Sequence, residues 1–310
     1  MNIETYKIKN AAVILLLLIS GSLAAQQEPM FTQYNFNTQV INPAYAGTWE
    51  NTGFMLLGRQ QWIGMEGAPQ TYTLSVQTKT GNDKVGLGIN VMSDNVGREK
   101  RLGLFGDYSY GFQVNENSVL QLGLKFGVTS YQNNLTQYLQ YPGEADPSLQ
   151  LDSDVRYLPN FGVGAYWYAD NYFLGFSVPK IMENEFETNY NNYSTQAELR
   201  HFYLIGGYVF NLSDVVKFKP TFLAKTIVGV QPEFDFSANF LLAEKVWLGG
   251  TYRTGNSFGF VAQWIIENLR IGYGVDFSTT KLQAFNYGSH EVMVSYEISF
   301  KKKYSSPRMF

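Results

Sequence analysis

Few residues of this chain could carry out catalysis. It contains two histidines and no cysteine, which excludes disulfides, thiolate nucleophiles and thiolate metal sites. Ser289, His290 and Glu291 follow one another, but neighbouring side chains of a strand point to opposite faces and cannot form a triad. His201 has no partner at the spacing of a metal ligand. We therefore predict a non-enzymatic protein without catalytic residues.

An acidic stretch is the remaining candidate for a ligand site. Asp152 and Asp154 flank Ser153, with Asp146 nearby. An EF-hand loop also needs a glycine and a closing glutamate, which this stretch lacks. A solvated loop is the better interpretation. Phosphate-binding loops and dinucleotide fingerprints do not occur in the sequence, so we expect neither a metal nor a cofactor.

Two stretches near the C-terminus indicate what the chain is built from. Residues 269–278 and 291–300 alternate apolar side chains with polar or small ones. Because successive side chains of a strand point to opposite faces, each stretch has one apolar and one polar face. Each is about ten residues long, as a tilted strand needs to be to cross a bilayer. Strands of soluble proteins average only about five or six residues.

The same unit recurs along the chain and predicts about fourteen strands, an even number as in bacterial outer-membrane barrels. The twelve further candidates are residues 53–61, 70–79, 84–93, 101–112, 119–131, 157–169, 171–180, 200–210, 215–226, 233–242, 245–254 and 257–266. Alternation is weak in 53–61 and 157–169. The predicted fold is all-β, a transmembrane antiparallel up-and-down β-barrel with an N-terminal periplasmic or lumen segment.

The connections between these strands support the prediction independently. Every other connection, beginning with 80–83, is a tight polar turn. The intervening ones are mostly longer, namely 62–69, 94–100, 132–156, 181–199 and 279–290. Outer-membrane barrels have short periplasmic turns and longer outer loops. With an even strand number, both termini are expected on the short-turn, periplasmic face.

The charge distribution fits a barrel with a polar lumen. Charged residues make up 16% of the chain, against about 25% in soluble proteins. A charge on the lipid face near the midplane would cost about 2–4 kcal/mol, so we expect polar faces to line the lumen. Its predicted charged members are Arg253, Arg270, Asp276, Glu291 and Glu297. The net charge of −3 gives no sign of nucleic-acid binding.

Four regions are expected along the chain. Residues 1–25 are typical of a signal peptide, with Lys7 and Lys9 before an apolar run and small residues before a cleavage site after Ala24 or Ala25. Residues 26–53 form the N-terminal periplasmic or plug segment. Residues 54–301 form the outer-membrane barrel, and 302–310 are a C-terminal tail. The lipid bilayer is thus an expected partner.

Residues 26–53 lack alternation and are rich in aromatic residues and asparagine. One interpretation is a solvent-side loop with a proline turn. The other is a segment that plugs the lumen or docks a partner. The residues we predict for this role are Phe31, Tyr34, Asn42, Pro43, Tyr45 and Gly47.

Several motifs together resemble the PorP/SprF family. They are Gln27-Glu28-Pro29, Phe31-Thr32-Gln33-Tyr34, Ile41-Asn42-Pro43-Ala44-Tyr45-Ala46-Gly47, Gly58-Arg59-Gln60-Gln61-Trp62, Gly67-Ala68-Pro69, Gly86-Leu87-Gly88, Leu248-Gly249-Gly250-Thr251-Tyr252-Arg253, residues 269–276 and Gly288-Ser289-His290-Glu291. The resemblance implies an outer-membrane protein of Bacteroidota acting in type IX secretion and gliding motility. Its implied partners are type IX components in the periplasm and outer membrane, and the C-terminal domain of a secreted adhesin.

Two other functions remain open at this point. A FadL-like transporter of hydrophobic small molecules would have a similar strand number and an N-terminal hatch with an Asn-Pro-Ala motif. An outer-membrane lipid hydrolase is disfavoured, because no serine, histidine and acid occur at a suitable spacing. The connections 132–156 and 181–199 match no motif, so the secreted client stays undetermined.

Overall fold

The computed structural model describes residues 28–80, 83–134, 155–187 and 194–298. The predicted signal peptide 1–25, the tail 302–310 and most of the connection 132–156 lie outside the described residues.

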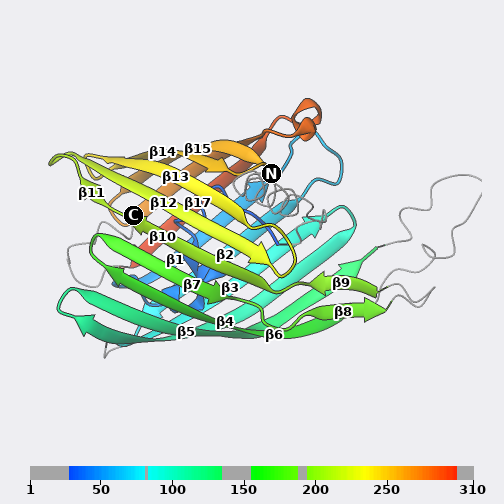
Figure 1. Cartoon of the computed structure of the whole chain (residues 1–310), viewed down its shortest axis with the longest axis horizontal. Coiled ribbons are helices and arrows are strands. Elements are labelled where there is room, and N and C mark those ends of the chain that lie inside the picture. Colours follow the sequence, from blue (N-terminus) through cyan, green and yellow to red (C-terminus); the bar gives the residue numbers. More distant parts are fainter. Residues whose placement is uncertain (1–27, 81–82, 135–154, 188–193, 299–310) are drawn as a thin grey trace, which may run out of the picture.

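Fourteen antiparallel strands form a closed ring (Figure 1). Strand β1 pairs with β2 and β17, while β10 pairs with β7 and β12 and closes the ring. The predicted barrel is therefore confirmed. The strands are β1 Thr52–Gln60, β2 Gln70–Lys79, β3 Val85–Val96, β4 Glu99–Asn115, β5 Ser118–Asn133, β6 Arg156–Ala169, β7 Tyr172–Val178, β10 His201–Tyr208, β12 Val216–Ile227, β13 Glu233–Leu242, β14 Val246–Arg253, β15 Ser257–Ile266, β16 Leu269–Ser278 and β17 Ser289–Ile298.

Three short strands lie outside the ring. Strand β11 (Phe210–Asn211) continues the pairing of β10 with β12. Strands β8 (Asn184–Glu187) and β9 (Ser194–Glu198) form a separate hairpin, which projects at one end of the barrel (Figure 1). The sequence predicted only a loop at 181–199, because strands of four or five residues are too short for alternation to be recognised.

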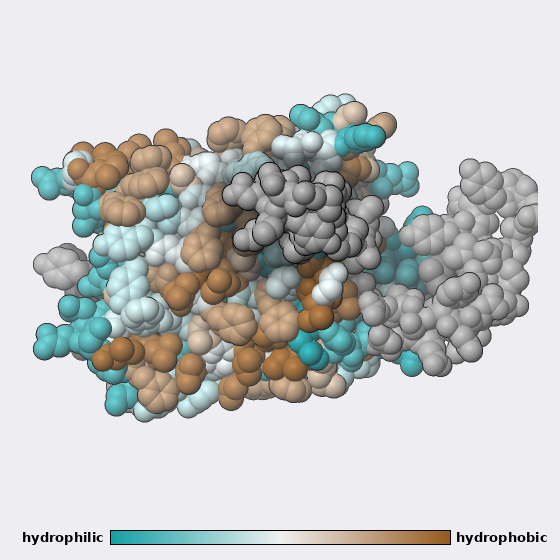
Figure 2. Space-filling model, viewed as in Figure 1, coloured by the Kyte–Doolittle hydropathy of each residue, from teal (hydrophilic) through white to brown (hydrophobic). Residues whose placement is uncertain are grey.

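The outer wall is apolar, as the alternation predicted. In β16, Ile271 and Tyr273 are exposed, whereas Arg270 and Asp276 are buried inside the barrel. Apolar side chains cover much of the wall, and hydrophilic ones gather at its two ends (Figure 2). No helix among the described residues is long and apolar enough to cross a membrane.

The connections differ between the two ends of the barrel. At one end are tight turns, such as 116–117, 170–171 and 267–268. At the other are the long connections 61–69, 134–155, 179–200 and 279–288, the last of which contains the 3-10 helix η4 (Lys281–Phe285). The prediction of a longer connection at 94–100 was wrong. Strands β3 and β4 extend to a two-residue turn, where Gly97 adopts a φ of 58°, the left-handed region that glycine enters without steric cost.

Residues 28–51 lie inside the ring and form the core of the molecule. They contain the short helix α2 (Thr38–Ile41) and the 3-10 helix η1 (Pro43–Tyr45), and most of their side chains are buried. We call this segment the plug. It explains the weak alternation of β1, where Met55 and Leu57 point inward and pack against the plug while Phe54 and Leu56 are exposed on the outer wall. Both faces of this strand are therefore apolar.

Candidate functional site

The lumen is the candidate functional site, and buried ion pairs hold the plug within it. Glu291 of β17 accepts hydrogen bonds from the backbone amides of Thr32 at 3.0 Å and Gln33 at 2.9 Å. Arg59 of β1 lies 3.3 Å from the same carboxylate and 2.8 Å from Asp276 of β16. All three charged side chains are at most 5% exposed. The alternation of the sequence predicts Glu291 and Asp276 in the lumen but does not single out Arg59, although Arg59 is the only charged residue of the predicted strand 53–61.

A second ion pair holds the plug at Phe31. The guanidinium of Arg253 makes hydrogen bonds to both oxygens of Asp235, at 2.8 and 2.9 Å, and also donates to the Phe31 carbonyl at 3.1 Å. A bidentate contact with a carboxylate orients the guanidinium, so one nitrogen is held towards the plug backbone. Nearby, the Tyr34 hydroxyl lies 3.2 Å from both Thr221 Oγ1 and Ser237 Oγ.

The Asn-Pro-Ala-Tyr motif forms the turn in the middle of the plug. Asn42 caps η1 by accepting a hydrogen bond from the Ala44 amide at 2.9 Å, and it donates to the Ala165 carbonyl of β6 at 3.1 Å. Pro43 occupies the first position of η1, where a missing N–H costs nothing. The Tyr45 ring packs edge-on against Tyr166 at 5.3 Å between ring centroids.

Glycines on the inner wall let the plug backbone approach the strands. A methyl group added to Gly123 would overlap the backbone of Ala44, and one added to Gly86 would overlap the Ala46 carbonyl. Gly47 of the plug has a φ of 73° and faces Gly86, and its amide donates to Gln77 at 2.9 Å. The predicted residue Gly47 is thus required by both its conformation and its close contact.

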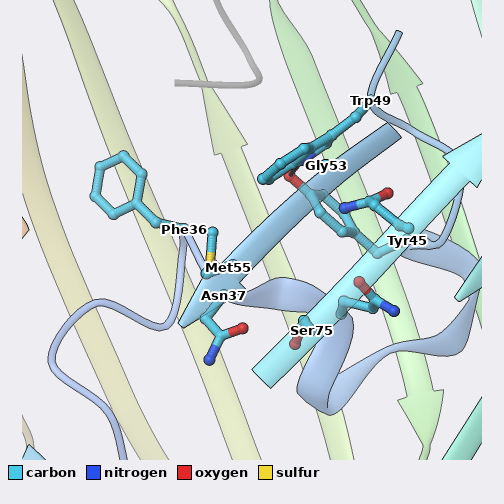
Figure 3. A pocket seen from close by; sticks show the side chains of 9 residues that line it. Phe36, Asn37, Tyr45, Trp49, Gly53, Met55 and Ser75 are labelled. Carbon is cyan, nitrogen blue, oxygen red and sulfur yellow. Dashed lines mark hydrogen bonds between the residues drawn. The ribbon is translucent and has the colours of Figure 1, made fainter. Parts of the chain in front are cut away.

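The last residues of the plug lie at the short-turn end of the barrel. The Trp49 ring lies against Gly53 (Figure 3), where a larger residue would overlap it. The Arg270 guanidinium lies 5.6 Å from the centre of the Trp49 ring and 3.8 Å from Glu297. Glu297 also accepts hydrogen bonds from the backbone and side chain of Asn51, both at 3.1 Å.

Aromatic side chains inside the barrel also contact the plug. Trp247 is 1% exposed and packs edge-on against Phe36 at 5.9 Å. The ammonium of Lys219, also 1% exposed, lies 5.1 Å from the Phe36 ring and 5.9 Å from the Trp247 ring. Trp247 is the second residue of β14, a position near a strand end where aromatic side chains of barrels often face the membrane interface. It points inward and packs on the plug instead.

Two small cavities lie between the described parts of the plug and the wall. A cavity beside Phe36, Tyr45 and Trp49 has a volume of about 10 Å³ (Figure 3). A second, lined by Phe31, Ile41, Phe105 and Lys180 among others, has about 40 Å³. A water molecule needs roughly 10–15 Å³ on this measure. The smaller cavity therefore has room for one water at most, and the larger has room for a few.

The side chains of Ser289, His290 and Glu291 have different partners and do not form a catalytic triad. His290 hydrogen-bonds Tyr273, and Ser289 accepts from the Trp62 amide at 3.2 Å. The Glu291 carboxylate accepts hydrogen bonds from two plug amides and pairs with Arg59. No group of three or more histidine and acidic side chains that could hold a metal occurs within the described ranges.

The comparisons with known proteins identify the family. A model described as type IX secretion system membrane protein PorP/SprF matches residues 23–296. This chain belongs to the PorP/SprF family. The resemblance seen in the sequence is confirmed. Family membership and the barrel fold together place the protein in the outer membrane. None of the curated protein sequences matches it.

Solved structures resemble the chain at low sequence identity. The monoaromatic hydrocarbon channel CymD has a TM-score of 0.53 at 11% identity, over 86% of this chain and 93% of that one. A FadL homologue of Pseudomonas aeruginosa has a TM-score of 0.45 at 12% identity, over 88% and 95%. The toluene transporter TodX of P. putida has a TM-score of 0.48 at 9% identity, over 86% and 95%. At this identity, the similarity to CymD indicates a shared fold.

Proposed function

We propose that the protein is a sealed, non-enzymatic component of type IX secretion that also serves gliding motility. It acts as the membrane anchor of periplasmic machinery, or as the partner in export and surface attachment of a large adhesin. The observation that carries this proposal is the plug, which fills the barrel of a PorP/SprF family member and is held by buried ion pairs. A barrel whose lumen is filled can bind protein partners through its surfaces, but it cannot serve as a pore.

The two roles place the partner on opposite faces. An anchor must bind at the short-turn end, where Leu212 and Val215 are 58% and 60% exposed in the turn before β12. A partner of a surface adhesin must bind at the long-connection end, where Phe285 and Tyr287 are 71% and 80% exposed. Large exposed apolar side chains are where protein contacts are expected.

Variants of the two faces test the proposal. In a deletion strain, we expect loss of a type IX reporter from the medium or cell surface, and recovery by the wild-type gene. If the protein is an anchor, the double variant Leu212→Asp, Val215→Asp should lose type IX components in pull-downs from detergent. Phe285→Ala, Tyr287→Ala should then keep them. The reverse result supports the adhesin role, whereas normal secretion in the deletion strain contradicts both.

The alternative is a FadL-like transporter of hydrophobic small molecules. The filled lumen argues against it, because drug-sized ligands occupy cavities of roughly 300–1,000 Å³ and the larger cavity described above has about 40 Å³. Uptake of a hydrophobic tracer into vesicles that contain the purified protein would support the transporter function instead.

A further inference from the structure

We infer that the plug crosses the outer membrane, with Glu28 at the cell-surface mouth and Asn51 at the periplasmic mouth. We further infer that Glu28, Lys180 and Glu198 form an ion-pair latch, which ties the outer end of the plug to the connection 179–200.

The first residues of the plug contact the long-connection end of the barrel. Glu28 pairs with Lys180 at 2.9 Å, just beyond Val178, the last residue of β7. The Phe31 carbonyl accepts from Arg253, the last residue of β14 before the turn at that end.

The last residues of the plug contact the opposite end. The Gly47 amide donates to Gln77, near the end of β2 that leads into a tight turn. Asn51 contacts Glu297, next to the last residue of β17.

The contacts of the plug with strand β17 give the distance between the two ends of the plug. It contacts Thr32 through Glu291 and Asn51 through Glu297. These carboxylates are six residues apart on one face of the strand, and a strand rises about 3.3 Å per residue. The plug therefore spans about 20 Å along the barrel wall. Short turns of outer-membrane barrels face the periplasm, which places Glu28 at the cell surface. The sequence predicts both termini on the periplasmic face. The described C-terminal end of the chain agrees, because Ile298 pairs with Thr52 at the short-turn end, whereas Glu28 lies at the opposite end.

The latch joins three parts of the chain that are distant in sequence. Lys180 Nζ lies 2.9 Å from Glu28 and 3.0 Å from Glu198. Glu198 is 2% exposed and also accepts hydrogen bonds from Thr129 of β5 and Asn160 of β6, at 2.8 and 2.9 Å. Lys180 and Glu198 stand at the two ends of the segment that carries the β8–β9 hairpin. The outer end of the plug is therefore tied to both ends of this segment through Lys180.

Single cysteines test the direction of the plug, because the chain has none of its own. A cysteine inserted before Glu28 should react with a membrane-impermeant maleimide on intact cells. Phe285→Cys, on a long connection, should react in the same way. Asp214→Cys, in a tight turn, should react only after the outer membrane is permeabilised. If the inserted cysteine behaves like Asp214→Cys instead, the inferred direction is wrong.

The latch is tested by the reactivity of a cysteine beside it. In a Met30→Cys background, Lys180→Met should raise the maleimide reaction rate about tenfold or more, because it leaves two carboxylates near the mouth uncompensated. Glu28→Gln keeps the Lys180–Glu198 pair and provides a milder test if Lys180→Met does not assemble. Lys217→Met, which removes the pair with Glu244 at the short-turn end, is the control. An unchanged rate in both latch variants would disprove the latch. Neither experiment depends on the secretion role.

Discussion

The Arg59 guanidinium lies 2.8 Å from the Asp276 carboxylate, inside the barrel, with both side chains at most 5% exposed. Arg59 also contacts Glu291 and the Thr32 hydroxyl, so one cation joins three strands to the plug. We expect Arg59→Met to lower the free energy of unfolding by about 3–5 kcal/mol, because two buried carboxylates lose their cation. Denaturant-induced unfolding in lipid vesicles measures this value.

The control for this prediction is the pair of Lys217 and Glu244 at the short-turn end. Its nitrogen–oxygen distance is also 2.8 Å, but the Glu244 side chain is 69% exposed. Lys217→Met should therefore change the free energy of unfolding by no more than about 1 kcal/mol. Equal effects of the two substitutions would contradict the role given to Arg59.

The close approach of the plug to the wall predicts a cost for one added methyl group. Gly123→Ala should lower the free energy of unfolding by about 1–3 kcal/mol, since the new methyl overlaps the backbone of Ala44. Gly250→Ala is the matched control, because the nearest atom to its added methyl is 3.9 Å away. It should be neutral or slightly stabilising, by up to about 1 kcal/mol. If both variants unfold like the wild type, the plug is not packed as described.

The lipid contact of the outer wall predicts the effect of a charge on it. Leu124 lies in the middle of β5 and is 55% exposed. Leu124→Arg should lower the free energy of unfolding in a bilayer by about 2–4 kcal/mol. Asn117→Arg, in the tight turn after β4, should change it by about 0.5 kcal/mol or less. A tolerated arginine at position 124 would argue against a membrane-facing wall.

Acid should release the outer end of the plug. Burial alone would raise the pKa of the Glu28 carboxyl, but Lys180, aided by His201 and Arg101, lowers it from 4.5 to about 2. A lowered pKa means that the ionised carboxylate stabilises the folded state above pH 4.5, and that this contribution is lost as the pH falls towards about 2. Burial lowers the pKa of the Lys180 ammonium, but the carboxylates of Glu28 and Glu198 raise it above its ordinary value. Lys180 therefore stays charged throughout this pH range.

Hydrogen exchange measures this release. The protection of residues 28–31, corrected for the intrinsic exchange rate, should stay constant from about pH 7 to about pH 5 and fall between 4.5 and about 2. Glu28→Gln should show no transition in that range. A wild-type profile that matches the variant would exclude Glu28 as the titrating group.

The barrel could be predicted from the sequence because lipid and lumen impose a period of two on each strand. Leu269–Ser278 is an example, since its predicted and observed bounds agree. The path of the plug could not be predicted, because its residues follow no period and its contacts join positions as distant as Thr32 and Glu291. Motif residues such as Asn42 and Gly47 were recognised as unusual, but only the fold shows which strands they touch.

The lumen residues were predicted less completely than the strands. The alternation of side chains along each strand places Arg253, Arg270, Asp276, Glu291 and Glu297 on polar faces. In the structure, each of them contacts the plug or a charged residue that holds the plug. The alternation alone gives no reason to expect that Arg59 or Lys219 contacts the plug more closely than other polar residues of the strands. Their importance follows from burial against the plug, which is a property of the folded chain.

Conductance in planar bilayers tests the central claim, that the plug seals the barrel, most directly. The purified wild-type protein should give no steady open-channel current. A variant that lacks residues 28–50 and retains β1 should give stepwise conductance, because the polar inner wall is then open to water. A steady open-channel current through the wild-type protein, of the same size as that of the deletion variant, would contradict the account.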